Sequence, residues 1–127
     1  MNVKQVIVVR NDLRSKLRHG KLAAQVAHAS MGAVFSESYV EFNEKRIPLK
    51  PELEHWLNEE FTKIVLRCDD EAQLLSIHQQ AVDASLLTAL IKDSGHTVFS
   101  EPTYTCVGIG PATAEDLAPI TSALKMY

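Results

Sequence analysis

The chain has 127 residues and a formal net charge of −3, and 46% of its residues are hydrophobic and 23% charged. These values are typical of one globular domain, and no stretch has the roughly 18 uncharged apolar residues of a membrane helix. The negative charge argues against a nonspecific nucleic-acid coat. Because no cationic segment precedes the first apolar run, we predict a cytoplasmic chain without a targeting signal or membrane partner.

The first half of the chain is predicted to form a strand, a loop and two helices. Residues 6–9 are a continuous β-branched run, typical of a strand that is buried on both faces. A loop over 11–19 leads to a helix over about 21–35, and the polar segment 36–60 is expected to contain a short helix over about 52–61. The residues predicted to face the core are Leu22, Val26, Ala29 and Ala33 in the first helix and Trp56, Leu57 and Phe61 in the second.

A second strand over 64–66 is followed by a helix that is predicted to end near residue 84. Asp69 is its predicted N-cap, because the acidic residues Asp70 and Glu71 would then lie in the first turn, where negative charge is favoured. The residues expected to be buried in this helix are Leu74, Leu75, Ile77, Ala81 and Val82.

Two further strands and one helix are predicted in the last third of the chain. The strands cover 87–92 and 104–109, and Gly110-Pro111 is expected to break the second. Thr113 and Asp116 have the spacing of a capping box, which opens a helix to about residue 125. This order of elements predicts an α/β layered domain around a four-stranded sheet.

Three polar side chains share one stripe of the first predicted helix. Lys21, Gln25 and His28 are four and three positions apart, which places them on the same helix face. An amine, an amide and an imidazole are unsuited to an apolar core, so the stripe indicates a surface that handles an anion or an ester. His28 could carry a proton, or it could be a packed histidine bonded to a backbone carbonyl.

Two aspartates follow predicted strands. Ligands of open α/β sheets bind beyond the carboxyl ends of parallel strands, where Asp12 follows the first strand and Asp93 the third. If these strands are parallel neighbours, Asp93 lies close to Lys21. Such a pair could orient water and stabilise developing negative charge, or it could be an ordinary salt bridge.

Charge is distributed unevenly along the sequence. Residues 10–21 contain five basic residues and one acidic residue, whereas 37–60 contain seven glutamates and three basic residues. The basic segment is either a solvated loop or a surface that binds phosphates. The candidate substrate-binding residues are Arg10, Asp12, Arg14, Lys16 and Arg18.

Other reactive residue types give weaker signals. Cys68 and Cys106 lie in apolar runs without a Cys-x-x-Cys motif, so we predict small buried hydrophobic residues. Gly108-x-Gly110 lacks the third glycine of a dinucleotide site and indicates a close backbone approach or a bend. We expect no metal, because the histidines lack ligand spacing: they are His19, His28, His55, His78 and His96.

Four segments of this chain together resemble the type 2 peptidyl-tRNA hydrolases of archaea and eukaryotes. They are VVRNDL at 8–13, GKLAAQVAHA at 20–29 with Gly32 and Ala33, KIVL at 63–66 with LIKDSGHT at 90–97, and TYTCVGIGP at 103–111. The resemblance covers the domain except the 36–60 segment, which is predicted to be an acidic helical insert.

The resemblance implies an α/β sandwich whose four-stranded mixed sheet is flanked by helices on both faces. It also implies hydrolysis of the ester between a peptide and the 3′ ribose of tRNA, without a cofactor and often in a homodimer. Lys21 would stabilise a phosphate or an oxyanion, Asp93 would position water, and water itself would attack. The other site residues carried over by position are Gln25, Thr97, Thr105 and His28.

This chain departs from the family pattern in three places. The loop before Gly20 is about two residues longer and lacks the usual methionine, His96 replaces a common arginine, and the 36–60 segment is longer and acidic. Two other functions therefore remain possible. One is a noncatalytic module that binds RNA, a nucleotide or a protein, and the other is hydrolysis of a smaller ester or amide.

Overall fold

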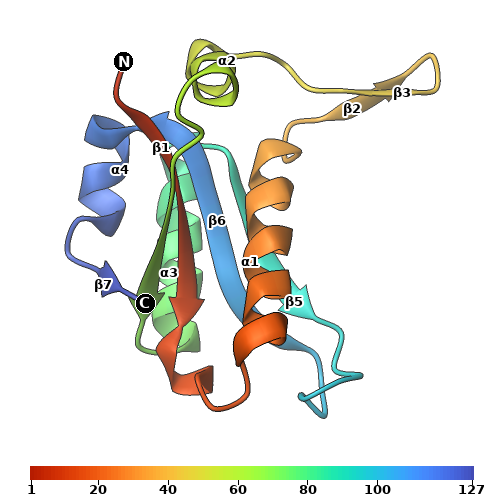
Figure 1. Cartoon of the computed structure of the whole chain (residues 1–127), viewed down its shortest axis with the longest axis vertical. Coiled ribbons are helices and arrows are strands. Elements are labelled where there is room, and N and C mark those ends of the chain that lie inside the picture. The colour runs from red at the N-terminus through yellow and green to blue at the C-terminus, as the bar shows by residue number, and fades with distance from the viewer.

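A five-stranded mixed sheet forms the centre of the computed structural model, which describes residues 1–127 (Figure 1). Its strand order is β5-β6-β1-β4-β7, in which β1 and β4 are parallel and the other neighbours antiparallel. The α/β class and the mixed sheet are confirmed, but the predicted number of four strands was wrong. The strands are β1 (Val3–Arg10), β4 (Lys63–Cys68), β5 (Thr88–Asp93), β6 (Thr103–Thr113) and β7 (Lys125–Met126).

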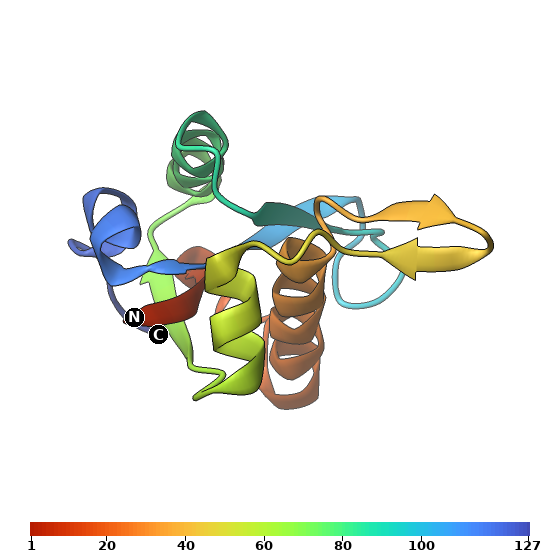
Figure 2. The same ribbon diagram turned by 90° about the horizontal axis from the view of Figure 1, so that it is seen from above.

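Helices cover both faces of this sheet, as predicted. Figure 2 shows α1 (His19–Val34) and α2 (Pro51–Asn58) on one face and α3 (Glu71–Asp83) and α4 (Ala114–Thr121) on the other. A short 3-10 helix, η1 (Asn11–Leu13), follows β1. None of the four α-helices has the length and apolar composition needed to cross a lipid bilayer.

Strand β1 is buried on both faces, as its β-branched run predicts. Val6 and Val8 pack in the cluster that includes residues of α3 and α4, whereas Ile7 and Val9 pack in the cluster beneath α1. Successive side chains of a strand point to opposite faces, so this one strand contributes to both halves of the core.

Helix α1 lies very close to β6. A Cβ atom added to Gly108 would overlap with the carbonyl oxygen of Ala29. Only glycine permits this approach, which confirms the interpretation of Gly108 as a site of close backbone contact. The packing fixes α1, and therefore its polar stripe, against the sheet.

The polar segment 36–60 contains a hairpin as well as the predicted helix. Strands β2 (Tyr39–Glu41) and β3 (Glu44–Arg46) pair with each other and project from the body of the protein (Figures 1 and 2). The turn places Phe42 and Asn43 at φ values of 51° and 60°. Because phenylalanine rarely adopts this left-handed conformation, no residue pattern at this position predicted a turn.

Three predicted element boundaries were wrong. Asp70, not Asp69, caps α3, because its side chain accepts a hydrogen bond from the backbone N–H of Gln73. Strand β6 continues through Gly110-Pro111. Thr113 caps α4 as predicted, but this helix ends at Thr121 and the chain then forms β7.

Two pairs of expected core residues are exposed. Leu57 and Phe61 are exposed, whereas Trp56 of α2 is buried against the sheet as predicted. Phe61 follows the end of α2 with a φ of 58°, and its ring contacts that of Trp56 at a tilt of 52°, with 4.4 Å between centroids. In α3, Leu75 and Val82 are exposed because the buried stripe is narrower than predicted and comprises Leu74, Ile77 and Ala81.

Candidate active site

Lys21 and Asp93 form an ion pair at the start of α1. The Nζ atom of Lys21 lies 2.6 Å from Oδ2 of Asp93, the last residue of β5. The side chain of Lys21 is 21% exposed and that of Asp93 is 7% exposed. The pair is therefore shielded on the carboxylate side and accessible on the ammonium side.

The route by which the two residues meet differs from the prediction. Strands β1 and β5 run in the same direction but are not neighbours, because β6 lies between them and pairs antiparallel with both. Asp93 reaches Lys21 because α1 crosses the face of β5 and β6. The proximity was predicted correctly, although the assumption of neighbouring parallel strands was wrong.

Gln25 connects this ion pair to β6. Its Nε2 donates to Oδ2 of Asp93 at 3.3 Å, and its Oε1 accepts from the Thr105 hydroxyl at 2.5 Å. Both Gln25 and Thr105 are buried. The Thr105 hydroxyl therefore fixes the orientation of the amide, so that Gln25 presents an N–H to the carboxylate.

The carboxylate of Asp93 is held in its charged form. Hydrogen bonds from Lys21 and from the backbone N–H of Gly95 lower its pKa below the usual 3.8, and the charges of Lys21 and His96 act in the same direction. Burial opposes this shift but is outweighed. A carboxylate with a lowered pKa is a weak proton acceptor and is suited to orienting donors and balancing charge.

Gly95 belongs to this cluster but was not among the predicted site residues. It has a φ of 86°, and an added Cβ atom would overlap with the backbone of Glu101. Its backbone N–H donates to Oδ1 of Asp93 at 3.0 Å. The Asp-Ser-Gly spacing at 93–95 was a detectable signal, since aspartate commonly bonds the backbone two residues ahead.

Thr97 lies at the solvent side of the cluster. The Nζ atom of Lys21 donates to its hydroxyl oxygen at 2.6 Å, and Thr97 itself is exposed. The Thr97 hydroxyl donates to no protein acceptor, so it can donate to a molecule bound beside Lys21. Thr103, on the neighbouring strand β6, bonds instead to the backbone carbonyl of Glu101 and does not join the cluster.

His28 is not brought to the cluster. It is exposed on α1, and its side chain takes part in none of the protein's hydrogen bonds or ion pairs, so the packed-histidine interpretation was wrong. It lies seven positions after Lys21, which corresponds to about 10 Å along a helix. His28 lies on the same face of α1 as Lys21 and Gln25, as predicted. Only Lys21 and Gln25, however, form hydrogen bonds with Asp93.

Two of the predicted substrate-binding residues are bound to each other. Arg10 donates from Nε and Nη2 to the two carboxylate oxygens of Asp12, at 3.0 and 2.8 Å, and from Nη1 to the carbonyl oxygen of Tyr104. The hydrogen bond to Asp12 raises the pKa of Arg10 further. This fork joins the end of β1 to β6 and leaves little of the guanidinium for a ligand.

The other three predicted substrate-binding residues, Arg14, Lys16 and Arg18, are exposed and form no ion pairs. Arg14 stacks over the ring of Tyr127 at 3.8 Å, and Lys16 lies 5.7 Å from the ring centroid of Phe99, in the loop that carries Thr97. Arg18 is the N-cap residue of α1. These residues therefore lie at the same end of the protein as Lys21.

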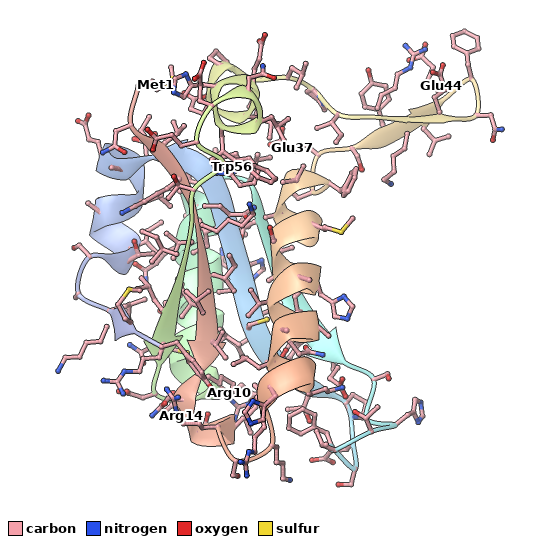
Figure 3. The ribbon with its side chains drawn as sticks, in the orientation of Figure 1. Met1, Arg10, Arg14, Glu37, Glu44 and Trp56 are labelled. Atoms are coloured by element: carbon pink, nitrogen blue, oxygen red, sulfur yellow. The ribbon has the colours of Figure 1, made fainter.

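The acidic insert lies at the opposite end. Figure 3 shows Glu37 and Glu44 at the upper end of the view and Arg10 and Arg14 at the lower end. The glutamates of the insert therefore do not interrupt the basic surface around Lys21. A surface with this charge suits a polyanionic ligand.

Neither cysteine is suited to nucleophilic attack. Burial raises the pKa of Cys68 to about 11 and that of Cys106 to about 12. Both thiols are buried, as predicted, and Cys106 donates to the backbone carbonyl of Gln25. They are protonated at neutral pH, and the thiolate is the reactive form.

Comparison with known proteins gives one consistent result. The family model described as peptidyl-tRNA hydrolase PTH2 matches residues 3–127. The peptidyl-tRNA hydrolase of Methanopyrus kandleri is 44% identical over 123 residues, which cover 97% of each chain, and that of Sulfurisphaera tokodaii is 39% identical over 126 residues, covering 99% of each. A probable peptidyl-tRNA hydrolase 2 of Drosophila melanogaster is 36% identical over 98% of this chain and 62% of its own length.

Proposed function

The chain belongs to the PTH2 family of peptidyl-tRNA hydrolases, and on that basis we propose that it hydrolyses the ester of peptidyl-tRNA at Lys21 and Asp93. The observation that carries the proposal is the ion pair between Nζ of Lys21 and Oδ2 of Asp93, shielded on one side and open on the other. This chain differs from the usual family pattern in the 14–19 loop, at His96 and in the insert, but the ion pair is present.

Lys21 is assigned to the negative charge that develops in the reaction. Its Nζ carries three hydrogens, of which Asp93 and Thr97 accept two. The third is available to the carbonyl oxygen of the ester, which becomes an oxyanion when water attacks. An ammonium that is already oriented stabilises this charge without rearrangement.

Asp93 is assigned to positioning Lys21 and the attacking water. Its lowered pKa makes it a poor permanent proton acceptor, whereas its oxygens can still accept a hydrogen bond from water. Water adds to the ester carbon, the bond from that carbon to the ribose 3′ oxygen breaks, and this oxygen leaves with one of the two water protons. The other proton is released when the new carboxyl group ionises. The products are a peptide with a free carboxylate and an intact tRNA.

Gln25, Thr105 and Thr97 are assigned to orientation. The hydrogen bond from Thr105 to Gln25 turns the amide N–H toward Asp93, and the second N–H of Gln25 remains free for water or substrate. The Thr97 hydroxyl lies beside Nζ of Lys21 and can bond the same ligand. His28 has no assigned part, because no contact links it to this group.

The basic surface is assigned to the tRNA. Arg14, Lys16 and Arg18 are exposed, unpaired with carboxylates and close to the start of α1. Phosphate contacts of this kind position a nucleic acid and make its affinity fall with salt. Because the substrate arises during translation, we also propose that the protein acts in the cytoplasm.

A homodimer is the remaining part of the proposal. An open apolar groove of about 540 Å³ lies between α1, β4 and β7, and seven of its nine lining residues are hydrophobic, among them Leu22, Val26 and Val65. A second copy would cover this groove. Sedimentation should give twice the chain mass, and Val26→Asp should give the monomer. A wild type that sediments as a monomer at all concentrations would reject the dimer.

The proposed activity is tested by the release of the blocked amino acid from N-blocked aminoacyl-tRNA by the purified protein. We expect multiple turnovers without added metal or cofactor, and a tRNA that can be aminoacylated again. Binding of this substrate without release would instead identify a noncatalytic module. Cleavage of simple esters with an intact tRNA ester would indicate a smaller substrate.

A further inference from the structure

Arg67 and Lys125 lie directly opposite each other in the sheet. Strands β4 and β7 are antiparallel, and their register pairs these two residues. Paired residues carry their side chains on the same face, with Cβ atoms about 4.5–5.5 Å apart. Neither cation forms an ion pair with a carboxylate. Like charges in this position destabilise a sheet, so the pair has a cost in the free protein.

A polar cavity lies at this pair. Its volume is about 320 Å³, and Arg67 and Lys125 both contribute to its lining. Arg67 is half-buried and Lys125 is exposed, so the cavity is open to a ligand from solvent. The other polar residues that line it are Asn11, Asp69 and Gln73.

The two amides of the cavity have unused donors. The Oδ1 atom of Asn11 accepts from Nε of Arg14 at 2.8 Å, and Oε1 of Gln73 accepts from the backbone N–H of Asp69 at 2.6 Å. The side-chain NH₂ group of neither residue donates to a protein acceptor, so both remain available to a ligand. Two cations and two amide donors outweigh the single carboxylate, which is the chemistry of a site for a phosphate oxyanion.

The cavity and the active site lie at the same end of the sheet. Strands β5, β1 and β4 run in one direction, and Asp93 and Arg67 are at or next to the carboxyl ends of β5 and β4. Three strand spacings of about 4.8 Å separate β5 from β4, and four separate it from β7, which gives distances of about 14 and 19 Å. Arg14 follows β1 between them and contacts Tyr127, two residues beyond Lys125.

We propose that Arg67 and Lys125, with the amides of Asn11 and Gln73, bind a backbone phosphate of the tRNA about 14–19 Å from the reacting ester. This inference rests on the proposed function. The bound phosphate would neutralise the positive charges of Arg67 and Lys125. Their repulsion in the free protein is therefore the cost of having a site for the phosphate. The contact positions the tRNA and takes no part in the chemistry.

The test compares two charge-matched double variants. Arg67→Gln with Lys125→Gln should raise the KM for N-blocked aminoacyl-tRNA by about tenfold and leave kcat unchanged. The slope of log KM against log salt should fall by about 0.7–0.9 for each phosphate that the variant no longer binds. Lys4→Gln with Lys45→Gln removes the same charge near the other end of the sheet and in the hairpin, and should leave the KM within about twofold.

A short substrate separates this inference from the proposed function. An N-blocked aminoacyl ester of adenosine cannot reach the cavity, so all variants should cleave it at the wild-type rate. No cleavage of either substrate by the wild type would reject the proposed function and this inference with it. Normal cleavage of the tRNA substrate with equal KM values for the two double variants would reject this inference alone.

Two further variants distinguish ligand binding from a structural contribution. Arg67→Gln should raise the melting temperature of the free protein, because it removes the repulsion from Lys125. Asp69→Asn should lower the KM for the tRNA substrate, because it removes the carboxylate of the cavity. A lowered melting temperature in the first variant or a raised KM in the second would contradict the phosphate site.

Discussion

The Nζ atom of Lys21 lies 2.6 Å from Oδ2 of Asp93, although the two residues are 72 positions apart in the chain. One is at the start of α1 and the other at the end of β5, and β6 lies between β5 and β1 in the sheet. The contact therefore depends on how α1 packs across the sheet. The same packing brings Gln25 and Thr105 to the carboxylate.

The lowered pKa of Asp93 predicts a specific dependence of stability on pH. A carboxyl group whose pKa is lower in the folded state binds fewer protons there than in the unfolded chain, so its stabilisation is complete above about pH 4 and is lost as the pH falls through the folded-state value. Urea unfolding from neutral to acidic pH should give a free-energy difference between wild type and Asp93→Asn that shrinks as the pH falls. A constant difference would contradict the ion pair.

Removal of the Thr105 hydroxyl should reduce both activity and stability. Thr105→Val leaves Oε1 of buried Gln25 without its donor, which costs about 1–3 kcal/mol and frees the amide to turn. We expect kcat to fall about tenfold, which corresponds to about 1.4 kcal/mol in the barrier. Thr103→Val is the matched control, since this hydroxyl bonds only the Glu101 carbonyl at the edge of the site. Equal kcat values for the two variants would show that the Thr105 hydroxyl does not orient the amide.

His28→Ala should retain nearly the full rate. The imidazole is exposed and makes no hydrogen bond, so its loss changes neither the charge beside Asp93 nor the orientation of Gln25. Substitutions on an exposed surface typically change stability by less than about 0.5 kcal/mol. A rate reduced about a hundredfold, measured at saturating substrate, would restore His28 to the active site.

Gly108→Ala should displace α1 from the sheet. The added methyl group would overlap with the carbonyl oxygen of Ala29, which cannot retreat without moving the helix. We expect a loss of stability of at least about 1–3 kcal/mol, together with reduced turnover because Lys21 and Gln25 move with α1. Gly20→Ala is the control, because no atom lies within 4 Å of its added Cβ. If thermal unfolding gave both variants the same melting temperature, the close contact would be refuted.

The parts of the site that could be predicted are those fixed by local periodicity. The spacing of Lys21 and Gln25 places them on one face of a helix, and Asp93 follows an apolar run typical of a strand. Each of these patterns can be recognised within a short segment of the sequence. The partner strand of β5 depends on long-range pairing, which no local pattern encodes. The prediction that β1 and β5 are parallel neighbours was therefore wrong, although the predicted proximity of Lys21 and Asp93 was correct.

The elements that were not predicted have weak local signals. Strand β7 has two residues, Lys125 and Met126, and shows no alternation that could be recognised. The β2–β3 hairpin turns at Phe42 and Asn43, where the usual glycine is absent. The paired hydrogen bonds between Arg10 and Asp12 could not be predicted from the number of charged residues, because such a count treats each basic side chain as unpaired.

The most direct measurement is the single-turnover rate of amino-acid release from N-blocked aminoacyl-tRNA by wild type, Lys21→Met and Asp93→Asn. Loss of the oriented ammonium or of the carboxylate that holds it should slow release by about 10²–10³-fold each, with the fold intact by circular dichroism and the KM little changed. Folded variants that both release the amino acid at the wild-type rate would show that the chemistry does not occur at this ion pair.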